Sequence, residues 1–140
     1  MKTINTAKAT ANGRAGHVKT DDGKIDMDLS VPKSMGGDGG PGTNPEQLFA
    51  SAYAGCYGSA LLACAKKMQV DLGDFNVKAT IKLGVDEEGD LNLSAVLDSY
   101  LPGVDVETGE DLVNQAHEMC PFSRATRDNI DVTLNLMLDE

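Results

Sequence analysis

A carboxylate, a thiol and aromatic rings share one stripe of a strongly predicted helix in the middle of the chain. At 100° per residue, these side chains fall within about 100° of one another: Glu46, Phe49, Tyr53, Cys56 and Tyr57. Such a stripe is typical of a core-facing helix surface. A thiol and a carboxylate on that stripe also make a candidate nucleophilic site.

Cys56 needs help from another part of the chain to act as a nucleophile. It lies in the middle of the predicted helix, where the helix dipole lowers a thiol pKa little, and apolar surroundings raise it. The candidate cation is Arg14, just after the Asn12-Gly13 turn, and Glu46 could hold its guanidinium in a bidentate fork. Alternatively, Arg14 is a solvated turn residue.

The other cysteines have several possible roles. Cys64 follows Cys56 by eight residues, about 80° round the helix and roughly 12 Å along it, too far for a disulfide within an intact helix. We interpret Cys64 as a small buried residue. His117 stands one turn before Cys120 and could activate it, or join Cys56 and Cys120 as a metal ligand, although the spacing matches no zinc pattern.

Composition excludes several classes of partner. The 140 residues carry a formal net charge of −10, which argues against binding to nucleic acid or to an anionic membrane. The N-terminus lacks the apolar region of a signal peptide, and three cysteines do not form a secreted disulfide framework. We expect a soluble cytoplasmic protein with reduced thiols and a single domain over residues 1–140.

Local patterns predict an α+β domain with antiparallel sheet packed on helices, in the order β-β-β-α-β-β-α-β. Turn signals at Asn12-Gly13 and Asp22-Gly23 predict hairpins near the N-terminus. The predicted elements are strands within the first thirty residues, a Gly- and Pro-rich loop over 32–44, a helix capped by Asn44 and running to about Met68, a hairpin over 75–97, a helix capped by Thr108 and ending near Cys120-Pro121, and a last strand over 130–138.

The predicted central helix has no charged residue over 48–65. Its length reaches the threshold for a membrane span. Its many Ala, Gly and Ser residues make it only weakly hydrophobic, which favours a buried helix that another backbone can approach closely.

Three segments bring the candidate residues together in one pattern. They read GRAGHV over 13–18, GTNPEQLFA over 42–50 with Cys56 soon after, and CPFSRATRDNI over 120–130. In order and separation they resemble the organic hydroperoxide resistance (Ohr) proteins of the OsmC/Ohr superfamily, across essentially the whole chain. Arg124 and Asp128 are less typical, and we expect them to alter only turn geometry or surface charge.

The resemblance implies a thiol peroxidase of the oxidative stress response. By position in the motifs, Cys56 matches the cysteine that attacks the peroxide and Cys120 the resolving cysteine. Arg14 and Glu46 match the pair that keeps Cys56 as a thiolate. The implied substrates are organic hydroperoxides and the implied reductants are dithiols such as dihydrolipoyl groups on lipoylated proteins. No metal or organic cofactor is required.

Substrate and assembly follow the same resemblance. Candidate substrate-binding residues are Phe49, Tyr53, Tyr57 and Phe122, because aromatic rings suit an organic hydroperoxide. The resemblance implies antiparallel sheets packed around a long buried central helix in an intertwined homodimer. Ten residues of helix separate Glu46 from Cys56, roughly 15 Å, so antiparallel packing of two copies near Ser51 would bring Glu46 of one chain beside Cys56 of the other.

Three other functions compete with the peroxidase. The closest is the OsmC branch of the superfamily, with the same chemistry and a broader peroxide preference. A non-catalytic module for fatty or aromatic ligands would leave the cysteines without a role. A redox sensor that binds DNA is disfavoured by the net charge of −10.

Overall fold

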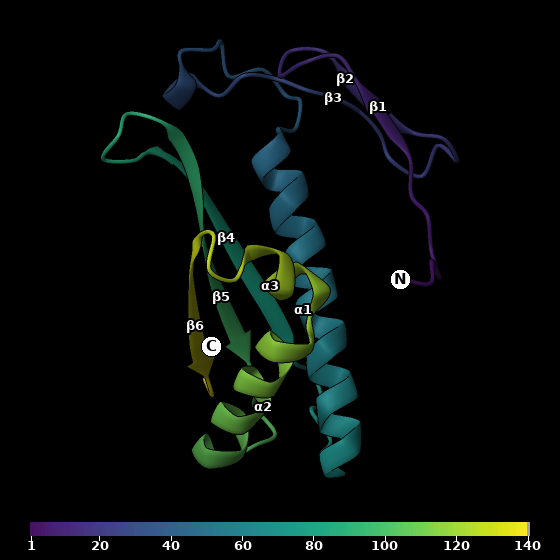
Figure 1. Ribbon diagram of the computed structural model, residues 1–140, viewed down its shortest axis with the longest axis vertical. Helices are drawn as coiled ribbons and strands as arrows, with labels where there is room; N and C mark the ends of the chain where they lie inside the picture. Colours follow the sequence, from purple (N-terminus) through teal and green to yellow (C-terminus); the bar gives the residue numbers. More distant parts are fainter. Residues whose placement is uncertain (140) are drawn as a thin grey trace. The chain divides into compact units, whose positions relative to one another are not determined.

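The computed structural model describes residues 1–139 and comprises two compact units, Met1–Leu48 and Phe49–Glu140. We describe each unit by itself (Figure 1). The single domain expected over 1–140 stays a prediction.

The first unit is built on a small antiparallel sheet in the order β1-β2-β3. Its strands are β1 (Ala9–Ala11), β2 (His17–Thr20) and β3 (Asp26–Asp28), followed by the short 3-10 helix η1 (Lys33–Met35). The β1–β2 connection runs over 12–16 and is longer than the two-residue turn that Asn12-Gly13 predicts. The longer loop is stabilised by the Asn12 side chain, which accepts a hydrogen bond from the His17 N–H at 2.9 Å, and by Gly13 at φ 103°.

The Gly- and Pro-rich loop is closed at its base by backbone pairing. The Thr43 N–H donates to the Asp28 carbonyl, and the Ser30 N–H donates to the Thr43 carbonyl, both at 2.9 Å. The loop therefore leaves the sheet and returns to it immediately before the long helix begins.

Helix α1 (Pro45–Met68) begins as the sequence predicts. The Asn44 side chain accepts a hydrogen bond from the Gln47 N–H at 2.9 Å, and Pro45 occupies the first helical position, where no N–H is needed. The helix ends in a Schellman-type turn, in which Gln69 takes φ 58° and the Val70 N–H donates to the Ala65 carbonyl at 2.9 Å.

The second unit packs a three-stranded sheet against helices (Figure 1). Its elements after α1 are β4 (Asn76–Val85), β5 (Leu91–Tyr100), α2 (Val106–Met119), α3 (Pro121–Thr126) and β6 (Asp131–Met137). The largest buried side chains come from α1, from β5 and the residue that follows it, and from α2: Tyr53, Tyr57, Leu61, Leu97, Leu101 and Leu112. This is the predicted α+β class.

Two details differ from the sequence prediction. Strand β6 pairs parallel to β5, not antiparallel, because the α2–α3 segment crosses over between them and returns the chain in the same direction. Helix α2 is capped by Asp105 rather than Thr108, since the Asp105 carboxylate accepts the Thr108 N–H at 2.8 Å. The cap therefore lies one turn earlier.

Helix α1 is buried on one side only within this chain. It is long and apolar enough to cross a membrane by length and composition alone, and a third of that stretch is buried. Its exposed residues include Ser51, Ala52, Gly55, Ser59 and Leu62. The sequence predicts a buried helix that another backbone can approach closely, and within residues 1–139 the small residues of this face are exposed.

Candidate active site

Two thiols meet in the second unit. The Sγ atoms of Cys56 on α1 and Cys120 lie 3.4 Å apart, with the Cys120 thiol donating. Cys56 is partly exposed, whereas Cys120 is 0% exposed. Of the two thiols, Cys56 is therefore the one that a molecule arriving from solvent can contact directly.

Cys120 lies at the elbow between two helices. It ends α2 and caps α3, because Pro121 cannot continue the first helix but fits the first position of the next. Its N–H donates to the Ala116 carbonyl at 2.8 Å, and its own carbonyl accepts from the Arg124 N–H at 3.0 Å. The predicted break at Cys120-Pro121 is confirmed, and it directs the thiol toward α1.

Burial dominates the electrostatics at Cys56. It raises the pKa of the Cys56 thiol above its ordinary value, while a hydrogen bond from the Phe122 backbone N–H acts in the opposite direction. The net direction disfavours the thiolate at neutral pH. A strong nucleophile at this position therefore needs a cation in addition to these groups.

An aromatic cluster lies beside the thiols. The rings of Phe49, Tyr53 and Phe122 contact one another, with centroids 6.0 to 6.3 Å apart. A largely apolar cavity of about 280 Å³ opens next to them, lined by Phe49, Leu93, Phe122, Ala125, Thr126, Asn129 and Ile130. Phe122 joins the two features, since it lines the cavity and its backbone lowers the pKa of the Cys56 thiol.

The two tyrosines of the predicted substrate-binding set direct their hydroxyls to other buried groups and not to this cavity. Tyr53 and Tyr57 are both 0% exposed and do not line this cavity. The Tyr53 hydroxyl bonds the Ser123 hydroxyl at 2.8 Å and the Thr126 hydroxyl at 3.2 Å. The Tyr57 hydroxyl donates to the Val113 carbonyl at 2.8 Å.

Arg14 and Glu46 pair within the first unit. Two hydrogen bonds join them, from Nη1 to Oε2 at 2.9 Å and from Nη2 to Oε1 at 2.6 Å. Their side chains are 36% and 16% exposed. The Arg14 guanidinium lowers the pKa of the Glu46 carboxyl, so both groups are charged. This is the fork that the residue types predict.

Cys64 is buried on α1, and His117 is half-buried on α2. Cys64 is 3% exposed, with its sulfur 3.9 Å from that of Met119. Burial lowers the pKa of His117, and its Nδ1 is buried without a hydrogen-bond partner among the described residues. Its carbonyl accepts from Arg127 at 2.6 Å.

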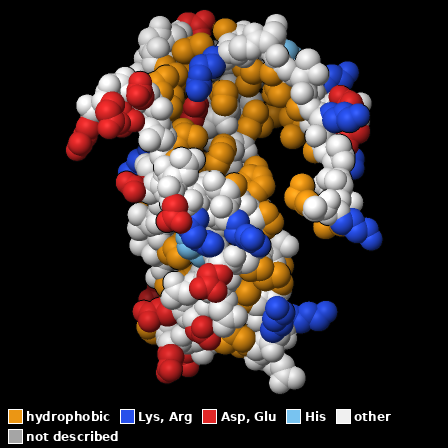
Figure 2. Space-filling view, viewed as in Figure 1, with side chains coloured by type: hydrophobic (Ala, Val, Ile, Leu, Met, Phe, Trp, Pro, Cys, Tyr) orange, Lys and Arg blue, Asp and Glu red, His pale blue; other side chains and the backbone are white. Residues whose placement is uncertain are grey.

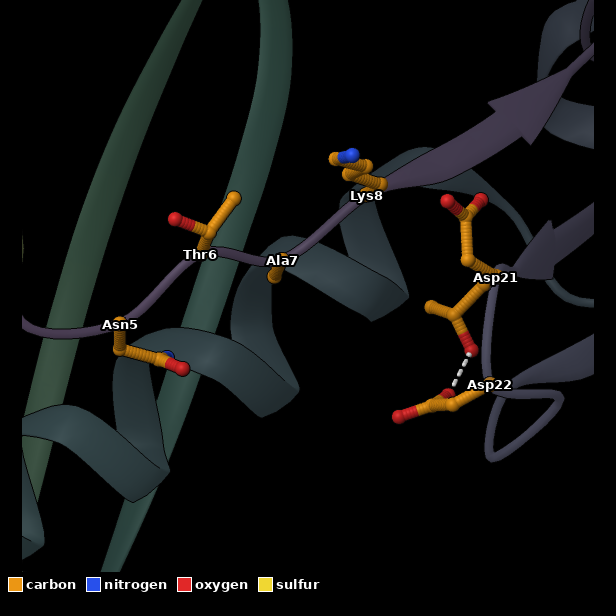
Figure 3. A pocket seen from close by; sticks show the side chains of 7 residues that line it. Asn5, Thr6, Ala7, Lys8, Asp21 and Asp22 are labelled. Atoms are coloured by element: carbon orange, nitrogen blue, oxygen red, sulfur yellow. Dashed lines mark hydrogen bonds between the residues drawn. The ribbon is translucent and has the colours of Figure 1, made fainter.

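Two further features are polar and contain no thiol. Figure 3 shows a hollow in the first unit, of about 660 Å³, between residues 5–8 and 20–22, where the Thr20 hydroxyl donates to Asp22 at 2.8 Å. The β4–β5 turn carries Asp86, Glu88 and Asp90 with oxygens close enough to share a cation. Figure 2 shows acidic side chains gathered at the end of the β4–β5 hairpin; Glu88 and Asp90 are exposed, and Asp86 is half-buried and accepts hydrogen bonds from N–H groups of its own turn.

Sequence reasoning assigned no role to the hydroxyls of Ser123 and Thr126 or to the cavity residue Asn129. All three lie in the segment 120–130 that it singled out. Spacing by three along a short helix was the available signal for the hydroxyls.

The chain is similar over most of its length to proteins of one family. Residues 36–135 match the OsmC-like protein family. OhrB, an organic hydroperoxide resistance protein of Bacillus subtilis, is 44% identical over 133 residues, 94% of this chain and 96% of the relative. The organic hydroperoxide resistance protein of Xanthomonas axonopodis pv. citri is 42% identical over 137 residues, 96% of each. A crystal structure of such a protein from Elizabethkingia anophelis superposes with a TM-score of 0.93 at 41% identity, over 99% of this chain and all of that one.

Proposed function

Because the chain belongs to the organic hydroperoxide resistance (Ohr) proteins of the OsmC family, we propose that it is a thiol peroxidase that reduces organic hydroperoxides to alcohols. The observation that carries this mechanism is the Cys56–Cys120 pair, 3.4 Å apart with one thiol accessible and the other buried. The proposed compartment is the cytoplasm, where these thiols are kept reduced between turnovers.

In the first step, the Cys56 thiolate attacks the distal oxygen of ROOH. The O–O bond breaks, the leaving alkoxide takes a proton as ROH, and Cys56 becomes a sulfenic acid. Partial exposure of Cys56 and full burial of Cys120 support this order of roles.

In the second step, the Cys120 sulfur attacks the Cys56 sulfenic sulfur. The S–O bond breaks, the hydroxyl leaves as water with the Cys120 proton, and a Cys56–Cys120 disulfide forms. The 3.4 Å separation supports closure without unfolding either helix, since a disulfide requires only that the sulfurs approach to about 2 Å.

Arg14 is the proposed cation for the Cys56 thiolate, and Glu46 the residue that orients it. The bidentate ion pair fixes the guanidinium plane while leaving further N–H donors free for a second anion. A cation beside Cys56 offsets the effect of burial, which raises the pKa of that thiol.

The apolar cavity beside Phe122 is the proposed site for the organic part of the hydroperoxide. Phe49 and Phe122 offer ring surfaces to an alkyl, aryl or fatty-acid chain, and Thr126 and Asn129 supply polar groups at the same wall. Such a lining favours an organic hydroperoxide over hydrogen peroxide.

A dithiol completes the cycle. It attacks the disulfide at the accessible Cys56 sulfur and releases the Cys120 thiolate, and its second thiol then frees Cys56 as the dithiol becomes a cyclic disulfide. Dihydrolipoyl groups on lipoylated proteins are the proposed reductants.

The proposed assembly is a homodimer with shared sites. The exposed small-residue face of α1 (Ser51, Ala52, Gly55, Ser59 and Leu62) supports close packing of a second copy. Mixing inactive Cys56→Ser and Glu46→Gln proteins should then restore activity in hybrid dimers. No recovery after proven subunit exchange would place both groups in one chain.

The decisive experiment is a thiol balance by intact mass. Reduced protein treated with about one equivalent of tert-butyl hydroperoxide should lose two hydrogens at once. Cys56→Ser should not, and Cys120→Ser should hold a sulfenic acid that dimedone traps. Equal rates with hydrogen peroxide would favour the OsmC-branch alternative, and slow loss irrespective of the peroxide would favour a ligand-binding module.

A further inference from the structure

Helix α3 is too short to be stable without contacts to the rest of the protein. Its six residues, Pro121–Thr126, are fewer than an isolated helix needs to be stable in water. Yet the Cys120 thiol at its start lies 3.4 Å from the Cys56 sulfur, and the backbone of Phe122, its second residue, lowers the pKa of the Cys56 thiol. The position of α3 therefore determines the geometry between the two sulfurs.

The Tyr53 side chain of α1 forms a hydrogen bond with α3 next to the two thiols. Tyr53 precedes Cys56 by three residues, and Ser123 follows Cys120 by three, so on each helix the two residues lie on neighbouring turns of one face. The Tyr53–Ser123 hydroxyl contact at 2.8 Å and the Cys56–Cys120 contact at 3.4 Å therefore lie side by side between the helices.

The hydroxyl contact is fully buried and shared. Ser123 is 0% and Thr126 6% exposed, and the Tyr53 hydroxyl reaches both. The Thr126 hydroxyl also donates to the Ser123 carbonyl at 3.1 Å. A buried hydroxyl that loses its partner is costly, so this cluster holds α3 firmly against α1.

We propose that Tyr53 is a positioning residue for the resolving step: its hydroxyl holds α3 so that the Cys120 thiol stays within reach of oxidised Cys56. This inference rests on the proposed peroxidase function. It assigns Tyr53 a role in disulfide closure rather than in substrate contact. The reaction that it affects is the attack of Cys120 on the Cys56 sulfenic acid, with loss of water.

The matched control is Tyr57. It lies one turn further along α1, is equally buried, and its hydroxyl also makes a buried hydrogen bond, but to Val113 on α2. Tyr53→Phe and Tyr57→Phe each keep the ring and remove one buried hydroxyl. Only Tyr53→Phe removes hydrogen bonds to α3.

The test measures how much of the Cys56 sulfenic acid reacts with added dimedone and how much with Cys120. Reduced protein receives one equivalent of tert-butyl hydroperoxide in the presence of a fixed concentration of dimedone, and intact mass gives the ratio of dimedone adduct to disulfide. This ratio depends on the closing rate and not on the rate of the first step. We expect it to rise about tenfold or more in Tyr53→Phe, because small misplacements of reacting atoms slow a reaction strongly. Tyr57→Phe should keep the wild-type ratio while its melting temperature also falls.

Equal ratios in Tyr53→Phe and Tyr57→Phe would overturn the inference. Ser123→Ala, which leaves the tyrosine ring in place, should raise the ratio in the same way and gives the same test if Tyr53→Phe does not fold. The double variant should not exceed Tyr53→Phe, since that variant already removes the contact that Ser123→Ala removes. If wild-type protein gives neither adduct nor disulfide, the proposed function itself has failed.

Discussion

The Cys120 thiol is fully buried and lies 3.4 Å behind the partly exposed Cys56 thiol. To form a disulfide the sulfurs need to approach by only about 1.4 Å. A partly exposed thiol is thus backed by a fully buried one, as the proposed peroxidase mechanism requires. This arrangement favours rapid capture of the sulfenic acid, before further oxidation.

Removal of Cys120 should leave Cys56 open to further oxidation. In Cys120→Ser, excess tert-butyl hydroperoxide should carry Cys56 to sulfinic and sulfonic acids, because no thiol intercepts the sulfenic acid. Intact mass should show gains of two and three oxygens, while the wild-type protein stops at the disulfide. Equal oxygen gain in both proteins would show that Cys120 does not capture the intermediate.

Arg14 should control the pH at which Cys56 becomes reactive. Burial raises the pKa of this thiol, and the guanidinium proposed to lie beside it would lower that pKa, so Arg14→Ala should move the pH midpoint of Cys56 alkylation upward. The thiolate fraction at neutral pH, and peroxidase activity with it, should fall by about tenfold or more for a rise of one pKa unit or more.

Arg14→Lys separates charge from geometry. It retains the charge but not the bidentate fork with Glu46, so its midpoint should lie between those of the wild type and Arg14→Ala. The measurement is iodoacetamide alkylation against pH in a Cys64→Ala, Cys120→Ser background. An unchanged midpoint in Arg14→Ala would show that Arg14 is not the cation beside Cys56.

Cys64 should be dispensable for chemistry. It is 3% exposed and its sulfur contacts the Met119 sulfur at 3.9 Å, so Cys64→Ala should lower the melting temperature through lost packing and leave the peroxidase rate unchanged. Cys64→Ser should be less stable than Cys64→Ala, because it buries an additional hydroxyl. A slower rate in folded Cys64→Ala would give this cysteine a role that its position does not suggest.

The cluster of His17, Asp26 and Asp28 should stabilise the first unit less at higher pH. Asp28 and Asp26 on β3 raise the pKa of His17 on β2. A raised pKa in the folded state gives stability that is complete below the ordinary value, about 6.5, and is lost as the pH rises through the folded value.

His17→Gln removes this contribution. The difference in melting temperature between wild type and His17→Gln should therefore be largest in mild acid and shrink as the solution becomes alkaline. Added salt should reduce the difference at acid pH, because the groups are exposed. A difference that is constant with pH would show that the cluster does not link β2 to β3 through charge.

Local patterns determined the elements and the candidate residues. Asn44 and Pro45 mark the start of α1, Pro121 breaks the chain after Cys120, and strand periodicity places β4, β5 and β6, because each signal depends on residues a few positions apart. The motif resemblance placed Arg14, Glu46, Cys56 and Cys120 together as candidates.

Only the tertiary structure decided which side chains meet. The aromatic stripe indicated that Tyr53 and Phe49 are buried, yet periodicity cannot say that one bonds Ser123 and the other lines a cavity. It also cannot reveal that Cys120 is hidden behind Cys56 or that β6 runs parallel to β5. A repeat along one helix or strand reports which face is buried, whereas the partner of that face comes from contacts more than sixty residues away in the chain.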